Sequence, residues 1–399
     1  MEKKVRFGIV GFGAQGSFYA GCLSNKGAFL PGMPAVACPP HCTIGAICDN
    51  DPVKEAAARE KYPEVPFYRD WKELALSNDV DVVVTTVPHY LHHEIAIFCM
   101  EHGVNVLVEK PAGVRAKDVI AMNRCAEAHP DVVFGIMFNQ RTNKLYQKVR
   151  ELVASGELGE IRRSNWIINT WWRPDSYYKQ SAWRATWGGE GGGVLVNQAP
   201  HQLDLWQWIC GSPIRVTSKN INGAYRDIVT ENDVTILTEY ANGATGCFIT
   251  CTHDAIGTDR FEIDLSAGKI VIENSAKATI YRMKRSEPEL NATMTIRDVE
   301  LLTKGNASGD RLYDTEVIEN VDAWGVQHTA VLENYALAVL TGSPLLAPGT
   351  DGIMGVNLAN ASQLSAWTGK TVDFPVDPEV YAAALNEHIA AEGKYPTRD

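Results

Sequence analysis

Short apolar runs and amphipathic stretches alternate along the first third of the chain. The apolar runs are five or six residues long, which is typical of strands buried in a sheet, and they fall at 5–10, 43–48, 80–85, 104–108 and 132–137. Between these runs, the spacing of apolar positions predicts helices at 14–23, 54–61, 71–75, 92–102 and 116–129. Strands that alternate with helices predict a parallel sheet with helices on both faces.

The pattern changes after about residue 145, where strands begin to follow one another directly. Residues 162–172 alternate polar and apolar positions, as a half-buried strand does. Two hairpins are predicted, one around Asn242 and Gly243 and the other around Ala267 and Gly268. This second region therefore predicts an antiparallel sheet, which can leave one face available to substrate or to a partner subunit. Helices predicted at 324–340 and 352–366 either cover this sheet or return to the first region.

The length of 399 residues favours two domains over one. One irregularity is a Gly- and Pro-rich insertion at residues 27–42, between the first helix and the second strand. A loop of this length is uncommon unless it is functional or disordered. It either borders a ligand or packs in an oligomer, and the sequence leaves both open.

Composition excludes several classes of protein. With 37 basic and 48 acidic residues the net charge is -11, which argues against a nucleic-acid partner. There is no apolar run long enough to cross a membrane and no secretory signal pattern, so a cytoplasmic protein without a membrane partner is expected. The nine cysteines are scattered without paired ligand spacing, so we expect free thiols and no bound metal.

A glycine-rich turn follows the first predicted strand and opens the first predicted helix. It consists of Gly11, Phe12, Gly13, Ala14, Gln15 and Gly16, which we assign to cofactor binding. In such a turn the first glycine permits the bend, the second admits a pyrophosphate, and the third allows the helix to pack closely. Asp49 ends the second strand, where a carboxylate binds both ribose hydroxyls and repels a 2′-phosphate, so NAD is favoured over NADP. The alternative is a glycine turn that binds no nucleotide.

Three further motifs complete a pattern that resembles the Gfo/Idh/MocA oxidoreductase family over nearly the whole chain. They are Glu109-Lys110-Pro111 after the fourth strand, residues 87–92 after the third, and residues 191–204, which read GGGVLVNQAPHQLD. The resemblance implies an α/β fold with an N-terminal Rossmann domain at 1–139. It also implies an α+β domain at 140–399 with a large, open-faced, mostly antiparallel sheet for substrate binding and oligomerisation.

The resemblance assigns catalytic roles to Lys110, His201 and Asn197, and all three are expected to touch the substrate. Lys110 matches the family's catalytic lysine; beside a cationic nicotinamide and partly desolvated, its pKa would fall toward working pH. His201 matches a second acid–base residue. Asn197 stands where the family often has aspartate, so Asp204, three residues after His201, is a candidate substitute. The alternatives are a surface lysine and a structural histidine.

Other positions match cofactor contacts of the family: Pro88, His92, Glu109, Lys110, Asn139, Trp183 and Arg184. The peptide before Pro111 resembles the family's cis-proline turn. Residues 188–193 are rich in glycine but follow no strand, so positive φ or close backbone approach is expected there instead of phosphate binding.

Seven aromatic residues between Trp166 and Trp187 suit the faces of sugar rings, although about half are expected in packing. Arg173 and Tyr178 in this segment are predicted substrate contacts. The function implied is NAD-dependent hydride transfer at a secondary hydroxyl of a sugar, glycoside or cyclic polyol, with glycoside 3-oxidation as one form. Two alternatives stay open: an NAD-dependent glycosidase or lyase with transient redox chemistry, and a non-catalytic sensor of NAD and sugar. A homo-oligomer, dimer or tetramer, is expected through the open sheet.

Overall fold

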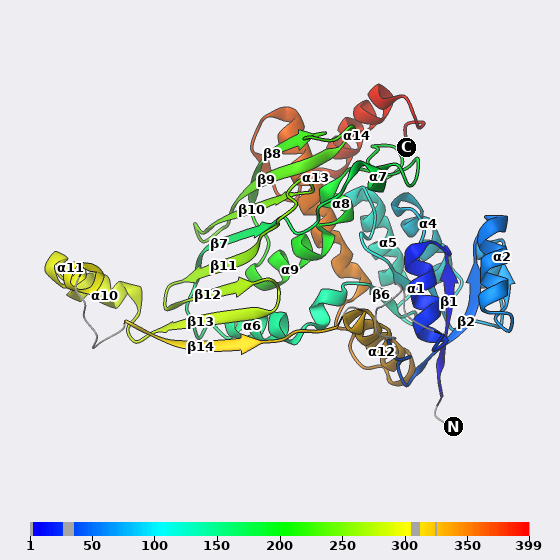
Figure 1. Ribbon diagram of the computed structural model, residues 1–399, viewed down its shortest axis with the longest axis horizontal. Coiled ribbons are helices and arrows are strands. Elements are labelled where there is room, and N and C mark those ends of the chain that lie inside the picture. Colours follow the sequence, from blue (N-terminus) through cyan, green and yellow to red (C-terminus); the bar gives the residue numbers. More distant parts are fainter. Residues whose placement is uncertain (1–2, 27–35, 305–311, 324, 399) are drawn as a thin grey trace.

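Two sheets lie next to each other in the computed structural model and are joined by helices (Figure 1). The structure describes residues 3–26, 36–304, 312–323 and 325–398. Residues 27–35 of the predicted insertion, and position 324 at the start of a predicted helix, therefore lie outside the described residues.

The first sheet has six parallel strands in the order β3-β2-β1-β4-β5-β6. The strands are β1 (Val5–Val10), β2 (Cys42–Cys48), β3 (Phe67–Tyr68), β4 (Val82–Thr85), β5 (Asn105–Val108) and β6 (Phe134–Ile136). The strand order reverses between β1 and β4, and in open parallel sheets this reversal opens a ligand crevice at the carboxyl ends of the strands. The helices that accompany the sheet are α1 (Ala14–Leu23), α2 (Pro52–Lys61), α3 (Trp71–Ala75), α4 (His92–Glu101) and α5 (Ala116–Ala128).

Both faces of this sheet are buried, which explains why its strands read as continuous apolar runs. Phe7 and Ile9 belong to the core on one face, and Val83 and Val106 belong to the core on the other. A late helix, α12 (Val326–Thr341), contacts β1 and β2 and supplies Tyr335 to the first of these cores. Part of the chain that follows the second sheet therefore packs against the first sheet.

The second sheet has nine strands in the order β14-β13-β12-β11-β7-β10-β9-β8-β15. All neighbouring pairs are antiparallel except β7 with β10. The strands are β7 (Ile161–Ile168), β8 (Arg215–Asn222), β9 (Glu231–Glu239), β10 (Thr245–Cys251), β11 (Asp259–Leu265), β12 (Gly268–Glu273), β13 (Lys277–Met283), β14 (Tyr313–Glu319) and β15 (Val372–Asp373). The strand predicted at 162–172 ends at Ile168, because its pairing with β11 ends there.

One face of this sheet is covered and the other is open. Helices α6 (Lys144–Ala154), α9 (Pro200–Cys210) and α13 (Gly352–Thr368) contribute to the core on the covered face, where Trp166 stacks on Phe261. On the open face Lys269 makes ion pairs with Glu262 and Asp264. The last helix, α14 (Pro378–Glu392), contacts α13 and α5, whereas α10 (Glu287–Thr293) and α11 (Ile296–Lys304) project from the far edge of the sheet (Figure 1). No helix in the described residues has the length and apolar character needed to cross a membrane.

Candidate active site

The glycine-rich turn between β1 and α1 leaves room for a ligand. Gly11 has a φ of +96°, and a Cβ there would lie 2.6 Å from the carbonyl oxygen of Thr86. By contrast, apart from its chain neighbours, no atom of the described residues lies within 4 Å of the place where a Cβ on Gly13 would be, and Gly13 caps the start of α1 without a side chain. The Nε2 atom of Gln15 is buried and has no hydrogen-bond partner among the described residues. Open space, a helix N-terminus and an unpartnered amide fit a pyrophosphate and its dinucleotide.

Asp49 lies directly beside this turn. It follows β2, and its Oδ2 accepts hydrogen bonds from the backbone N–H of Phe12 (2.7 Å) and from Lys54 Nζ (3.2 Å). The contact with Phe12 joins the carboxylate to the glycine-rich turn at the carboxyl edge of the sheet. This is the place from which an acid reaches the ribose of a bound dinucleotide.

Lys110 lies at the same edge, two residues after β5 ends. Its Nζ donates to the backbone oxygen of Asn197 (2.8 Å), which belongs to α8 (Val194–Asn197). Burial lowers the pKa of the Lys110 ammonium, while the carboxylates of Glu109 and Glu190 act in the opposite direction. Glu109 is itself buried, with a raised pKa, and accepts from the backbone N–H of Lys110 (2.9 Å) and from the hydroxyl of Tyr19. The structure thus gives Lys110 the desolvated setting that a general base needs.

The loop that carries Lys110 is fixed by a histidine. His92 follows Pro88 and the short helix η1 (His89–Leu91), and its Nδ1 lies 2.8 Å from the backbone oxygen of Pro111. Its Nε2 lies 2.9 Å from the backbone oxygen of Val87. Burial lowers the pKa of His92 to about 4, so the ring is neutral and donates to one of these carbonyls. The peptide between Lys110 and Pro111 is cis, as the resemblance implies.

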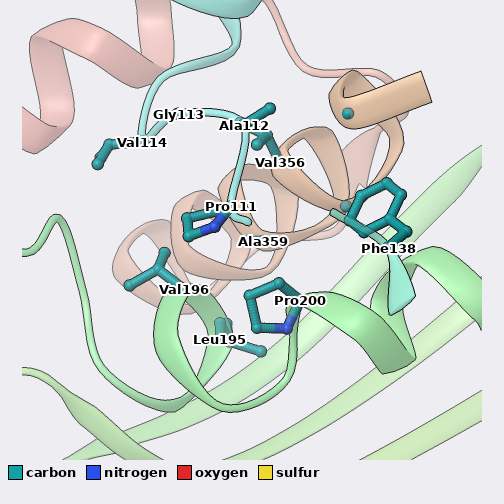
Figure 2. Close-up of a pocket in the computed structure, with 12 residues that line it drawn as sticks. Pro111, Ala112, Gly113, Val114, Phe138, Leu195, Val196, Pro200, Val356 and Ala359 are labelled. Atoms are coloured by element: carbon teal, nitrogen blue, oxygen red, sulfur yellow. The ribbon is translucent and has the colours of Figure 1, made fainter. Parts of the chain in front are cut away.

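An apolar contact between their neighbours fixes the relative positions of the three predicted catalytic residues. Figure 2 shows Pro111, Val196 and Pro200 lying around the same small apolar space, which is closed on another side by α13. Each of these residues is the direct neighbour of one predicted catalytic residue: Lys110, Asn197 and His201, respectively. Packing of the neighbours therefore sets the relative positions of the catalytic side chains.

His201, the second residue of α9, offers an unused nitrogen to this site. Its Nδ1 is buried and has no hydrogen-bond partner in the described part of the chain. Burial, with Lys110 and His328 nearby, holds the pKa of His201 well below its ordinary value. The imidazole is therefore neutral and can exchange a hydrogen bond or a proton with a bound hydroxyl.

The structure corrects the expectation that Asp204 assists His201. Asp204 is buried, and its two oxygens accept from Arg141 Nε (2.8 Å) and Nη2 (2.6 Å). Arg141 belongs to η2 (Asn139–Thr142) and also binds Asp351 (2.6 Å). A carboxylate bound by an arginine in this way links helix α9 to η2 and is not available to assist His201 in proton transfer.

Glu190 is a site residue that the sequence reasoning missed. Its side chain is 2% exposed, one oxygen accepts from the side-chain amide of Asn197, and the other accepts from the backbone N–H of Ala185 (2.6 Å). The sequence reading of residues 188–193 considered the backbone alone, and the positive φ values of Gly191 (+89°) and Gly192 (+149°) confirm that reading. The sequence signal that could have pointed to Glu190 is that it is the one carboxylate among the glycines of residues 188–193.

His328 on α12 is a second missed residue. Asn139, a predicted cofactor contact, has a buried Oδ1 without a partner in the described chain, and its Nδ2 lies 3.5 Å from His328 Nδ1. Burial lowers the pKa of His328 to about 4, and Lys110 acts in the same direction. The sequence signal for this stretch was helical periodicity, which carries no information about a site.

Arginine and aromatic side chains form one wall near Lys110. The guanidinium groups of Arg173 and Arg184 both pack on the ring of Tyr177, at 4.9 and 4.5 Å from its centre. The positive charges of both arginines lower the pKa of Lys110, so both lie close to it. Two more predicted contacts belong to this wall: Trp183 lies edge-on to His89, and Tyr178 shares a hydrogen bond with Thr252 (2.7 Å).

Two family models match the chain. The model of the GFO/IDH/MocA oxidoreductase family, with its NAD-binding Rossmann fold, matches residues 5–136, and the model of that family's C-terminal domain matches residues 146–271. The chain therefore belongs to the GFO/IDH/MocA oxidoreductase family, which confirms the resemblance. Its N-terminal part is the NAD-binding Rossmann fold of that family, and no finer identity follows from the two models.

Individual relatives are more distant. The 1-carboxy-3-chloro-3,4-dihydroxycyclohexa-1,5-diene dehydrogenase of Comamonas testosteroni is 29% identical over 50% of this chain and 46% of that protein. The match thus spans about half the length of this relative. Levoglucosan dehydrogenase of Pseudarthrobacter phenanthrenivorans is 24% identical over 67% of this chain and 73% of that protein. The WlbA dehydrogenase from Bordetella pertussis, solved with NADH and UDP-GlcNAcA, has a TM-score of 0.76 at 22% identity and covers 94% of this chain and 99% of its own. This structural likeness confirms the two-domain fold.

Proposed function

We propose that this protein is an NAD-dependent dehydrogenase that transfers a hydride between nicotinamide and a secondary hydroxyl of a sugar, glycoside or cyclic polyol. The observation that carries the proposal is the position of Lys110. It lies at the carboxyl edge of the first sheet, and its Nζ donates a hydrogen bond to Asn197, in the segment that also contains His201. A base, a neutral imidazole and a dinucleotide turn together fit oxidation of an alcohol.

In this proposal residues 1–139 bind the cofactor, and residues 140–399 bind the substrate and form the oligomer. Glycines 11, 13 and 16 and the start of α1 would hold the pyrophosphate, and Asp49 would hold the adenosine ribose. Gln15 and Asn139 have buried amide atoms, without a partner among the described residues, that are available to the cofactor. When bound, NAD supplies the hydride acceptor.

The residues of the chain would move the proton. The neutral amine of Lys110 would take the proton of the substrate hydroxyl as a hydride leaves the carbon that bears this hydroxyl, and Lys110 would become an ammonium. His201 exchanges a hydrogen bond or a proton with this hydroxyl or its neighbour through its free nitrogen. Asn197, Arg173 and Tyr178 orient the ring, since amide, guanidinium and phenol groups match sugar hydroxyls.

We also propose that the protein is cytoplasmic and forms a homo-oligomer, dimer or tetramer, through the open face of the second sheet. Two features support this: exposed apolar residues on that sheet, Leu237 (52%) and Val317 (50%), and the ion-pair groups on β11 and β12. Light scattering tests the oligomer, and a monomer at micromolar concentration would contradict it.

The catalytic proposal is tested by following NADH formation from a panel of inositols, sugars and glycosides. The wild type is compared with Lys110→Ala and with Lys148→Ala, a control lysine on α6 that is half exposed. Loss of the base predicts a fall in kcat of about 100-fold or more for Lys110→Ala and no change for the control. Conversion of glycosides without net NADH would establish the transient-redox alternative instead. NAD binding without any turnover would favour the sensor.

A further inference from the structure

The active site contains a buried carboxylate that the proton transfer above does not use. Glu190 stands in the turn at 188–193, where the positive φ values of Gly191 and Gly192 place it inside the protein. Its carboxylate is held on both oxygens, by the backbone N–H of Ala185 and by the amide of Asn197. Its backbone oxygen faces His89 Nδ1 at 3.1 Å. The position of this charge is thus fixed from three directions.

Asn197 connects this carboxylate to the catalytic lysine. The side-chain amide of Asn197 donates to Glu190, and its backbone oxygen accepts from Lys110 Nζ (2.8 Å). One residue therefore separates the carboxylate from the ammonium, and both contacts depend on the conformation of Asn197. Asn197 itself is neutral, so it offers Lys110 a carbonyl dipole but no opposite charge when the amine takes a proton.

We propose that Glu190 is a positioning residue of this dehydrogenase: through Asn197 it orients Lys110, and its negative charge stabilises the ammonium formed during alcohol oxidation. The inference rests on the proposed function for its catalytic part, while the link from Glu190 to Lys110 rests on the geometry alone. It also answers how the site works with a neutral amide at position 197, because the carboxylate is present one residue further away.

Burial shifts the pKa of Glu190 upward and that of Lys110 downward, which brings the two pKa values closer together. Burial raises the pKa of Glu190 to about 7, against the effect of Arg184 and Lys110. Burial also holds the pKa of His89 and of His201 well below the ordinary value. The groups that face Lys110 or Glu190 are Glu109, Arg173, Arg184, His89, His92, His201 and His328.

The sign of the effect follows from these charges. An ionised Glu190 favours the ammonium of Lys110 and raises its pKa, whereas the isosteric Glu190→Gln removes that charge and lowers it. A base must be neutral to accept a proton, so the acidic limb of the kcat–pH profile moves to lower pH in Glu190→Gln. The maximal kcat falls by about 10- to 100-fold, because the ammonium formed in the transition state loses its partner charge.

A charge-relocation cycle separates positioning from a merely structural role. In Asn197→Asp/Glu190→Gln the carboxylate returns at position 197, and we expect kcat to recover at least about tenfold over Glu190→Gln and the acidic limb to move back toward its original pH. In Asn197→Asp alone two carboxylates compete for one site, so its activity falls below that of the double variant. Failure of the double variant to recover, with an unmoved acidic limb in Glu190→Gln, would overturn the proposal.

A second readout needs no turnover. The rate at which acetic anhydride labels Lys110 is measured against pH by mass spectrometry, with Lys148 as the internal control. We expect half-maximal labelling of Lys110 at lower pH in Glu190→Gln than in the wild type, and no change at Lys148. If this shift occurs while the wild type oxidises no alcohol, the proposed function fails and the Glu190–Lys110 link stands. If the wild type is active and neither profile moves, the inference about Glu190 is wrong.

Discussion

Two glycine-rich segments border the candidate site, and they differ in what occupies the space next to their glycines. The first, at residues 11–16, leaves the space next to Gly13 empty of protein atoms. The second, at residues 188–193, is filled by the protein itself: a Cβ on Gly191 would meet the side chain of Val114, and one on Gly193 would meet the backbone oxygen of Glu231. Similar composition thus serves a ligand in one place and self-packing in the other.

The difference extends to charge. Helix α1 has no acidic residue in its first turn, so the helix N-terminus next to Gly13 can attract an anion. The second segment instead lies against two buried carboxylates, Glu190 and Glu231, and the latter accepts from the backbone N–H of Gly193 (2.9 Å). The first segment therefore leaves its helix N-terminus open to the negative charge of a ligand, although Asp49 is bound at Phe12, whereas the backbone N–H of Gly193 in the second segment is already bound by Glu231. The comparison teaches that a glycine run is informative only together with what surrounds its missing side chains.

The largest expected effect comes from adding a methyl group to the packed segment. Gly193→Ala would place a Cβ against the backbone oxygen of Glu231, which cannot move without disturbing β9. We expect a loss of about 2 kcal/mol or more in the free energy of unfolding. In thermal unfolding of a chain of this length, this corresponds to a fall in Tm of about 2 °C or more. A Tm within error of the wild type would contradict the packed character of this segment.

The matched substitution in the open segment should leave the fold intact and weaken NAD binding. A Cβ on Gly13 meets no protein atom within 4 Å, so Gly13→Ala is expected to have the Tm of the wild type without cofactor. The methyl group would occupy the space of the pyrophosphate, and we expect the Kd for NAD to rise about tenfold or more. Isothermal titration calorimetry measures this change. Unchanged affinity would mean that the dinucleotide does not approach Gly13.

The contrast between the segments also marks how far the sequence could predict the molecule. The predicted strands, the two hairpins and the first glycine turn follow from local patterns of apolar and turn residues, and these expectations are confirmed apart from shifts at strand ends. The strands β3, β8, β13, β14 and β15 were not predicted. Lys110 and His201 could be named as a pair because their motifs are short and contiguous. Their proximity was an inference from the family resemblance, and the structure supplies the shared apolar contact that explains it.

The missing parts depend on contacts between distant residues. Asp204 lies on the same helix as His201, but its partner is Arg141, 63 residues earlier, so helical spacing pointed to the wrong role. Glu190 points inward because two neighbouring glycines adopt positive φ, and His328 arrives from a helix that returns from the second domain. Spacing along the chain predicts none of these three contacts, because each depends on tertiary packing.

The smallest expected effect distinguishes the role of Glu231 from that of Glu190, the two buried carboxylates of the packed segment. Burial raises the pKa of Glu231 from its ordinary 4.5 to about 7, and its Oε2 has no hydrogen-bond partner in the described chain. The protonated form contributes its full stability below pH 4.5, and this contribution is lost as the pH rises through 7.

Glu231→Gln cannot ionise, so its stability relative to the wild type should rise between pH 5 and pH 6, by about 1 kcal/mol. Urea unfolding at several pH values measures the difference. Since Glu231 contacts the turn and not Lys110, the variant should keep the kcat–pH profile of the wild type, whereas Glu190→Gln should change it. A change in that profile in both variants would show that the two carboxylates act on the site together. The assignment of Glu190 to Lys110 and of Glu231 to the turn alone would then be wrong.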